Sequence, residues 1–302
     1  MTVAVNSSAS ATGQESTAPS PISVSGTKRS TWIKLRRDPR VIIAGCVLGF
    51  ASITAVFAPW LAPFDPQDMD ISLRLAPPSS AHWLGCDLNG GDVLTAMIYG
   101  ARTSLYVGFL TVLLSLTIGV AVGLVAGYKR GAVDTIFMRL VDLLMAFPGI
   151  LLAMALTALL GPSVHNVVLA IAATGWTSSA RLVRGQVLSV AQRDFVVACR
   201  ALGARDFRIL FKHVFPATWS PLVVHATFSL SGVILIEASL SFLGLGAQDS
   251  APSWGAILGQ GRTVLMEAPH LSLAPGLAIM LIVLALNFLG DALRDTLDPR
   301  GN

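Results

Sequence analysis

Residues 194–216, DFVVACRALGARDFRILFKHVFP, lie between two long apolar stretches and decide how the rest of the chain is interpreted. Seven of the 21 Lys and Arg residues fall within 181–212. Apolar residues recur at helical spacing at Phe195, Ala198, Cys199 and Leu202. Gly203 ends this pattern, a short second run follows through Phe207, and Pro216 precedes the next apolar stretch. The pattern predicts a helix, a turn and a second helix lying along a membrane surface.

The composition indicates a protein that folds in lipid. Of its 302 residues, 53% are hydrophobic and 13% are charged, whereas soluble domains carry about 25% charged residues. The mean hydropathy is +0.68, and uncharged runs of about 20 residues recur, which is the length a helix needs to cross the bilayer. We therefore predict an all-α integral membrane protein. The net charge of +4 is modest, so we predict no nucleic-acid partner.

The N-terminal 27 residues are rich in Ser, Thr, Ala and Pro, and we predict a disordered tail there. A basic collar follows at Lys28, Arg29, Lys34, Arg36, Arg37 and Arg40. The uncharged run 41–62 comes directly after the collar and predicts a first spanning helix. A cleaved signal peptide is the competing interpretation, but its apolar region would be shorter and its basic region would lie near the start of the chain.

Six apolar stretches predict six transmembrane helices, at 41–62, 103–127, 134–160, 166–180, 222–246 and 271–290. If the N-terminus is cytoplasmic, 18 of the 21 basic residues face the cytoplasm, and only Arg74, Arg102 and Arg262 lie outside. This asymmetry matches the positive-inside rule. We therefore expect both termini, and the segment 194–216, on the cytoplasmic side.

Small and polar residues within the predicted spans suggest packing contacts and candidate sites. Gly119, Gly123 and Gly127 recur every fourth residue, which favours close helix packing. Asp142, His225 and Glu237 are candidate intramembrane polar groups. We expect Asp142 to pair with Arg139, three residues away on the same helix. For Glu237, a structural hydrogen bond to a neighbouring helix and a direct role in transport both stay open.

The sequence contains no catalytic constellation. None of the four lysines stands in a G-K-[ST] step, and H-E-x-x-H and G-x-S-x-G are absent. Cys46, Cys86 and Cys199 fall in three different environments, so we expect neither a disulfide nor a metal site. An enzyme is therefore not predicted, and any ATP must be hydrolysed by another chain.

From about Arg36 to Arg300, the chain resembles the C-type permease subunit of the dipeptide/oligopeptide family of ATP-binding-cassette (ABC) importers. Residues 194–216 resemble its EAA loop, with Val197-Ala198-Cys199 at E-A-A, Gly203 at the Gly, and His213-Val214-Phe215-Pro216 at I-x-L-P. Val197 replaces the family's acid. Collinear matches include PPSSAHWLGCD, VDLLMAFP, GWTSSARLVRGQVL, EASLSFLGLG and GDALRDTLDPR. In the first loop, Cys86 and Gly91 stand where the family usually has Thr and Arg.

The resemblance implies a binding-protein-dependent ABC importer permease in the plasma membrane that imports dipeptides or oligopeptides. It implies four parts: the tail 1–27; 28–102 with collar, first helix and external loop; a permease core at 103–290 containing the coupling segment 193–216; and the cytoplasmic tail 291–302. ATPase coupling is assigned to Asp194, Ala198, Cys199, Arg200, Gly203, Ala204, Phe207 and Pro216.

The partners implied are a homologous second permease subunit, two cytoplasmic ATP-binding subunits and an extracytoplasmic substrate-binding protein. ATP and Mg²⁺ would be bound by the ATP-binding subunits, with no cofactor on this chain. The same class of importer carrying nickel complexes or another small solute is the alternative. A more distant alternative is a self-sufficient ion-coupled secondary carrier that uses Glu237 and His225, which would show inverted repeats with broken helices.

Overall fold

The computed structural model describes residues 38–246 and 252–297, and these residues form helices joined by loops, with no strand. The predicted tail 1–27 and most of the basic collar lie outside the described residues. The main helices are α2 (Pro39–Val56), α3 (Ala58–Leu61), α4 (Val93–Lys129), α5 (Gly131–Met145), α6 (Gly149–Leu160), α7 (Val164–Val190), α8 (Asp194–Ala201), α9 (Asp206–Ile209), α10 (Phe215–Ala217), α11 (Trp219–Phe242), α12 (Trp254–Gly261) and α13 (His270–Leu297). The all-α prediction is confirmed.

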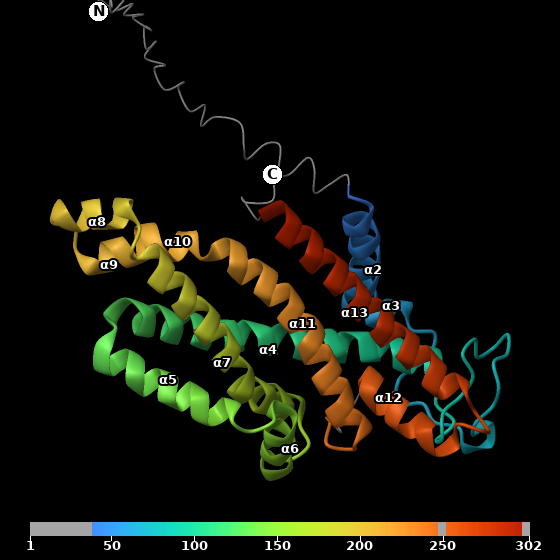
Figure 1. Ribbon diagram of the computed structural model, residues 1–302. Helices are drawn as coiled ribbons and strands as arrows, with labels where there is room; N and C mark the ends of the chain where they lie inside the picture. The colour runs from blue at the N-terminus through green and yellow to red at the C-terminus, as the bar shows by residue number, and fades with distance from the viewer. Residues whose placement is uncertain (1–37, 247–251, 298–302) are drawn as a thin grey trace, which may run out of the picture.

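Helix α4 is the longest element, and the other helices pack around it (Figure 1). Its 37 residues give a length of about 56 Å at 1.5 Å per residue, well beyond the bilayer core of about 30 Å. Asp92 caps its N-terminus by accepting a hydrogen bond from the Thr95 backbone N–H. The helix therefore begins ten residues before the predicted span 103–127 and includes part of the predicted external loop.

Three glycines allow α4 to lie directly against α7. A Cβ atom placed on Gly119 would lie 2.5 Å from Ser179 Cβ, and one on Gly123 would lie 2.7 Å from the Ala180 carbonyl oxygen. A Cβ atom on Gly127 would lie 2.9 Å from Val187 Cβ. Any larger residue at these positions would push the two helices apart, because the atoms it meets include backbone.

The third predicted span is not one helix, and that part of the prediction was wrong. Helices α5 and α6 form a bent pair with an angle of 85° between them. The break comes at Pro148, whose ring disfavours helical backbone in the residue before it and which has no N–H to donate. Four helices, α2, α4, α11 and α13, are long and apolar enough to cross a membrane, and the bent pair makes a fifth if counted as one span. Helix α7 is not among them, so six spans stay a prediction.

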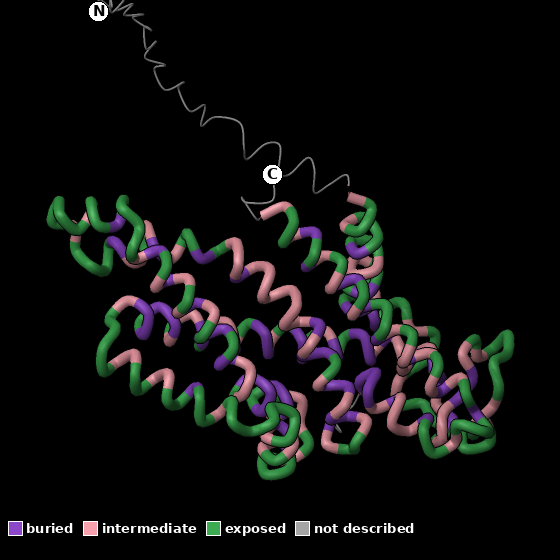
Figure 2. The backbone as a smooth tube through the Cα atoms, in the orientation of Figure 1, coloured by how far each residue is buried: buried purple, intermediate pink, exposed green. Residues whose placement is uncertain are grey.

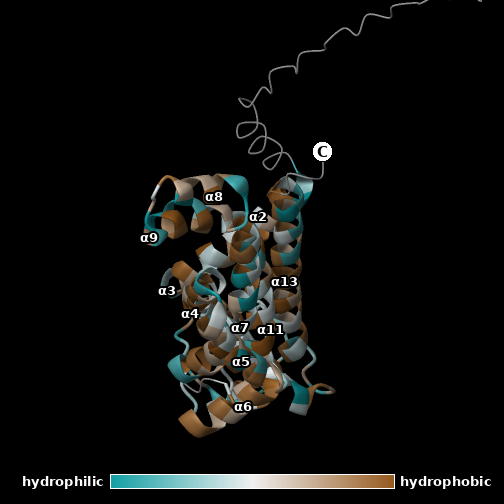
Figure 3. Ribbon diagram, turned by 60° about the vertical axis from the view of Figure 1, so that its left-hand side comes forward, coloured by the Kyte–Doolittle hydropathy of each residue, from teal (hydrophilic) through white to brown (hydrophobic). Residues whose placement is uncertain are grey.

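The two ends of the bundle carry different structures. Helices α8–α10 lie at one end, and the loop between α3 and α4 lies with α12 near the other (Figure 1). The start of α2 and the end of α13 meet through an ion pair of 3.1 Å between Arg40 and Asp295. Ser220 Oγ, at the start of α11, donates to the Leu297 carbonyl oxygen. In Figure 3 both helix ends lie at the same end of the bundle as α8–α10.

Buried residues lie along the helix contacts in the interior, and exposed residues cover the outer faces (Figure 2). Helices α2, α4, α11, α12 and α13 share one apolar cluster, which includes Ile234, Trp254 and Ile282. Large apolar side chains, including Phe50, Phe109 and Leu277, are exposed on the outer faces of spanning helices. Such exposure fits contact with lipid, where apolar surface carries no penalty.

Candidate functional site

The interhelical segment, residues 193–216, folds into short helices at one end of the bundle (Figure 1). Helix α8 ends at Ala201 with Leu202 as its C-cap, and Gly203 takes φ +80°, a left-handed conformation that favours glycine. The Ala204 N–H donates to the Cys199 carbonyl and the Gly203 N–H to the Arg200 carbonyl, which completes a helix-ending turn. Helix α9 follows and runs into a π-helical turn, Leu210–Val214.

The inner face of this segment is part of the apolar core. Val196, Ile209 and Val214 are completely buried. They pack with Leu124 of α4, Leu222 of α11, and a row on α7 formed by Val183, Val187 and Val190. The segment is thereby attached to three long helices, so any displacement of it must move them or break this cluster.

The outer face is apolar and exposed. Leu202 is 88% exposed and Phe207 is 73% exposed. Val197, Phe195 and Phe211 are also exposed. Five basic residues accompany them on the surface: Arg193, Arg200, Arg205, Arg208 and Lys212. An exposed apolar patch with a charged rim is the usual composition of a protein-binding surface.

A polar contact that the sequence did not predict joins the segment to the end of α4. Tyr128 Oη donates to Asp206 Oδ1 at 2.6 Å. The Arg200 guanidinium lies over the Tyr128 ring, 5.9 Å from its centroid. Tyr128 precedes the basic pair Lys129-Arg130 and stands 78 residues from Asp206, so no local spacing reveals the contact. It fixes the two ends of the turn around Gly203 to the longest helix.

The remaining motif positions are divided between the surface and the interior. Asp194, Ala198 and Pro216 are exposed, and Cys199 and Ala204 are half-buried. The Cys199 Sγ atom lies 4.0 Å from His213 Nε2. Pro216 does not interrupt the helical path, because it occupies an early position of α10, where a missing N–H is tolerated. The chain continues through Thr218 into α11.

Glu237 lies at a junction of three helices. It is 2% exposed; Ser241 Oγ donates to its Oε1 at 2.7 Å, and Ser104 Oγ of α4 donates to Oε2 at 3.3 Å. Ser104 Oγ also accepts from the Trp254 N–H at the start of α12. Of the two roles considered, the geometry favours the structural hydrogen bond to a neighbouring helix.

Asp142 and His225 also contact α7. Asp142 accepts a hydrogen bond of 2.7 Å from Arg181, so the expected pair with Arg139 was wrong. The reason is that α7 lies beside α5 and presents Arg181 to Asp142 and Arg184 to Asp134. His225 Nε2 lies 3.0 Å from Ser179 Oγ and 3.3 Å from Ser229 Oγ, so its contacts are with these serines of α7 and α11.

Comparison with known proteins assigns the chain to a family. Residues 119–301 match the family described as binding-protein-dependent transport system inner membrane component, and residues 28–78 match the N-terminal transmembrane domain of oligopeptide transport permease C. The chain belongs to the binding-protein-dependent transport permease family. This permease is 43% identical over 273 residues to the glutathione transport system permease protein GsiD of Pectobacterium atrosepticum, covering 90% of this chain and 91% of the relative. It is 41% identical over 272 residues to the dipeptide transport system permease protein DppC of Alkalihalophilus pseudofirmus, covering 90% of each.

The fold is shared with a solved transporter structure. The inward-facing MetNI methionine ABC transporter superposes with a TM-score of 0.58 at 20% identity, covering 68% of this permease and 98% of that chain. At this identity the likeness concerns the fold alone. Within residues 38–246 and 252–297, no three His, Cys, Asp or Glu side chains come together in a way that could hold a metal ion. Cys86 is completely buried, and burial raises the pKa of its thiol.

Proposed function

We propose that this permease is a transmembrane subunit of an ATP-driven ABC importer that moves small peptides into the cytoplasm. It would pair with a homologous second permease, two cytoplasmic ATPase subunits and an external peptide-binding protein. ATP and Mg²⁺ would be held by the ATPase subunits. The relatives support the solute class, since their names specify glutathione and dipeptide transport.

The observation that carries the proposal is the two-sided character of the interhelical segment. Its inner face is fixed to α4, α7 and α11, while its outer face presents Leu202, Phe207 and a basic rim. A surface that only contacted lipid headgroups would not need rigid attachment to three helices. A surface that transmits closure of an ATPase to the spanning helices does need it.

The arrangement of the chain ends supports the proposed orientation. The start of α2, the end of α13 and the interhelical segment lie at the same end of the bundle (Figure 3). This end also carries most of the Lys and Arg residues of the described chain. By the positive-inside rule, we place this end and both termini in the cytoplasm.

Replacement of one exposed apolar residue tests the docking role. Leu202→Asp changes a side chain that is 88% exposed, so it leaves the internal packing of this chain intact. We expect it to weaken ATPase binding by at least about 30-fold, which corresponds to loss of a hot spot, and to abolish ATP-driven dipeptide uptake.

The matched control is Met266→Asp, which changes a 96% exposed side chain in the loop after α12. We expect this variant to keep normal ATPase co-purification and uptake. Equal co-purification and equal uptake in the two variants would contradict the proposed docking surface. Absence of ATP-dependent dipeptide or glutathione uptake by the complete wild-type complex would contradict the peptide class.

A further inference from the structure

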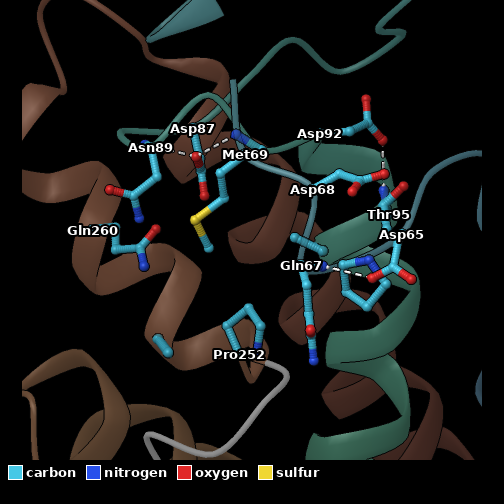
Figure 4. Close-up of a pocket in the computed structure, with 14 residues that line it drawn as sticks. Asp65, Gln67, Asp68, Met69, Asp87, Asn89, Asp92, Thr95, Pro252 and Gln260 are labelled. Carbon is cyan, nitrogen blue, oxygen red and sulfur yellow. Dashed lines mark hydrogen bonds between the residues drawn. The ribbon is translucent and has the colours of Figure 1, made fainter. Parts of the chain in front are cut away.

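A cavity of about 580 Å³ lies at the end of α4 opposite the interhelical segment. Its walls come from four places: the loop after α3, the loop that leads into α4, the first turn of α4, and helix α12 with Pro252, two residues before it. Figure 4 shows these residues surrounding one open space. In the orientation proposed above, the cavity opens on the external side.

All the charged side chains that line the cavity are acidic. Asp65, Asp68, Asp87 and Asp92 line it, and no Lys, Arg or His is among the lining residues. The carboxylate of Asp92 is fully used, because its oxygens pair with His82 Nδ1 at 3.0 Å and with the Thr95 N–H at 2.8 Å. The cavity thus combines one acid whose two oxygens are both hydrogen-bonded with three others.

The other three carboxylates keep oxygens that accept no hydrogen bond from the described residues. Asp65 uses Oδ1 to accept from the Gln67 N–H, and Asp87 uses Oδ1 to accept from the Asn89 and Gly91 N–H groups. The second oxygen of each is not used in these turns. Asp68 accepts no hydrogen bond from the described residues through either oxygen, so no turn or cap explains its position.

A second observation concerns Thr95, on the first turn of α4. Thr95 lines the cavity and is 1% exposed. Its hydroxyl has no hydrogen-bond partner within the part of the chain that the structure describes. A buried hydroxyl without a partner is unfavourable by about 1–3 kcal/mol, and rotation of the Thr95 side chain toward the cavity would let a ligand or water there pair with it. In Figure 4, Thr95 lies on the same side of the cavity as Asp65 and Asp68.

The spacing of the carboxylates selects the kind of cation. A Ca²⁺ or Mg²⁺ site needs several oxygens that converge within about 2–2.6 Å of one point, and no three acidic side chains of the described residues come together in that way. An ammonium or guanidinium group donates several hydrogen bonds in different directions and can use separated carboxylates. The volume also falls within the range of about 300–1,000 Å³ that is usual for sites of small organic ligands.

We propose that this cavity binds an organic cation, an ammonium or guanidinium group, with Asp65, Asp68 and Asp87 as acceptors of its N–H groups. Two sources offer this chemistry: the amino terminus of a transported peptide, and a Lys or Arg side chain of the external binding protein. The identification of these sources rests on the proposed function. The binding site itself is defined by the carboxylates and Thr95.

The first experiment measures binding without reference to transport. The purified complete transporter in nanodiscs is titrated with fluorescent trilysine amide at low ionic strength. We expect saturable binding to the wild type and about fivefold weaker binding to Asp65→Asn/Asp68→Asn, as two partly exposed ion pairs would give. Asn keeps the size of each side chain and can still accept the Gln67 N–H bond.

The matched control is Glu267→Gln, which removes one exposed carboxylate from the loop after α12 without changing the cavity lining. We expect its dissociation constant to equal that of the wild type. Equal dissociation constants in wild type and double variant, or no saturable binding to the wild type, would overturn the proposal.

The second experiment separates the two sources. If the peptide amino terminus occupies the cavity, the double variant raises the KM for a dipeptide with a free amino group and leaves uptake of its N-acetylated form unchanged. If a side chain of the binding protein occupies it, the double variant weakens docking of that protein whichever peptide it carries. A wild type without ATP-driven peptide uptake would contradict the proposed function, whereas the trilysine titration would still decide the cavity.

Discussion

The contact between α4 and α7 makes a quantitative prediction about Gly123. In Gly123→Ala, the added Cβ would lie 2.7 Å from the Ala180 carbonyl oxygen and 2.8 Å from Val183 Cβ. Ordinary van der Waals contact requires at least 3.4 Å, so α4 and α7 must separate by several tenths of an ångström. Overpacking of this kind costs about 1–3 kcal/mol. Because the main obstacle is backbone, we expect the upper half of that range, offset by about 1 kcal/mol of helix propensity that Ala gains over Gly.

Gly185→Ala provides the control, since it is the same substitution on the neighbouring helix. No atom lies within 4 Å of a Cβ placed at Gly185, so only the propensity gain of up to about 1 kcal/mol applies. The free energies of unfolding of the two variants should therefore differ by about 2–3 kcal/mol, with Gly123→Ala less stable than the wild type and Gly185→Ala slightly more stable.

The assay is equilibrium unfolding of the purified permease in mixed micelles titrated with SDS, followed by near-ultraviolet circular dichroism. Peptide uptake by the assembled transporter should follow the same order. The free energies of unfolding of the two variants could instead agree within about 0.5 kcal/mol, the scatter expected for substitutions that meet no special feature. The added methyl group at residue 123 would then meet no steric obstacle, and the close contact between α4 and α7 would be refuted.

Four further outcomes follow from the geometry. Glu237→Gln should keep folding and uptake near wild type. Glu237→Ala should lower the free energy of unfolding by about 1–3 kcal/mol, because it leaves buried serine hydroxyls without an acceptor. Loss of uptake in a stably folded Glu237→Gln variant would instead indicate a transport role for Glu237. Gly203→Val should reduce ATPase co-purification because φ is +80°, while Gly203→Asn, which tolerates this conformation, should not; equal loss would contradict the turn argument. At pH 8, the Cys86 thiol should react with an impermeant maleimide far more slowly than the thiol introduced by Asn89→Cys, because a raised pKa leaves a smaller thiolate fraction at Cys86. Equal rates would show that the buried thiol is accessible. Tyr128→Phe should retain ATP hydrolysis but lower its coupling to uptake, measured as ATP consumed per peptide, because the contact between α4 and α9 is lost; an unchanged ratio would contradict that link.

The elements that follow local patterns could be predicted from the sequence. The spacing of apolar residues and Gly203 indicated α8, the turn and α9, and the four-residue glycine repeat indicated a close helix contact. What failed depended on which helices lie side by side. Asp142 and Arg139 are near in sequence, yet α7 brings Arg181 to Asp142. The break at Pro148 was visible as a residue but was obscured by the apolar residues on both sides, which match a single span.

The acidic cavity is a second feature that the sequence alone did not reveal. Its aspartates are separated in the sequence and stand in Pro- and Gly-rich stretches, where Asp normally indicates a turn or a helix cap. Asp65, Asp87 and Asp92 do make such bonds. Only the fold shows that the turns face one space together with Asp68 and the unpartnered hydroxyl of Thr95. A site formed by residues with local structural roles gives no separate signal in a single sequence.

Helix α4 connects the two proposed sites mechanically. Thr95 lines the cavity near its first turn, and Tyr128 binds the interhelical segment near its last, about 50 Å away along the helix axis. Between them, Gly119, Gly123 and Gly127 hold α4 against α7, so the pair has little freedom to bend or slide. A force applied to the outer face of the interhelical segment would therefore move α4 as a rigid body and change the walls of the cavity that α4 shares with the loop after α3 and with α12. If this permease works with ATPase subunits as proposed, we expect occupancy of the cavity and ATPase closure to be coupled, and a mutation that loosens the glycine contact should weaken that coupling while leaving each site able to bind its own partner.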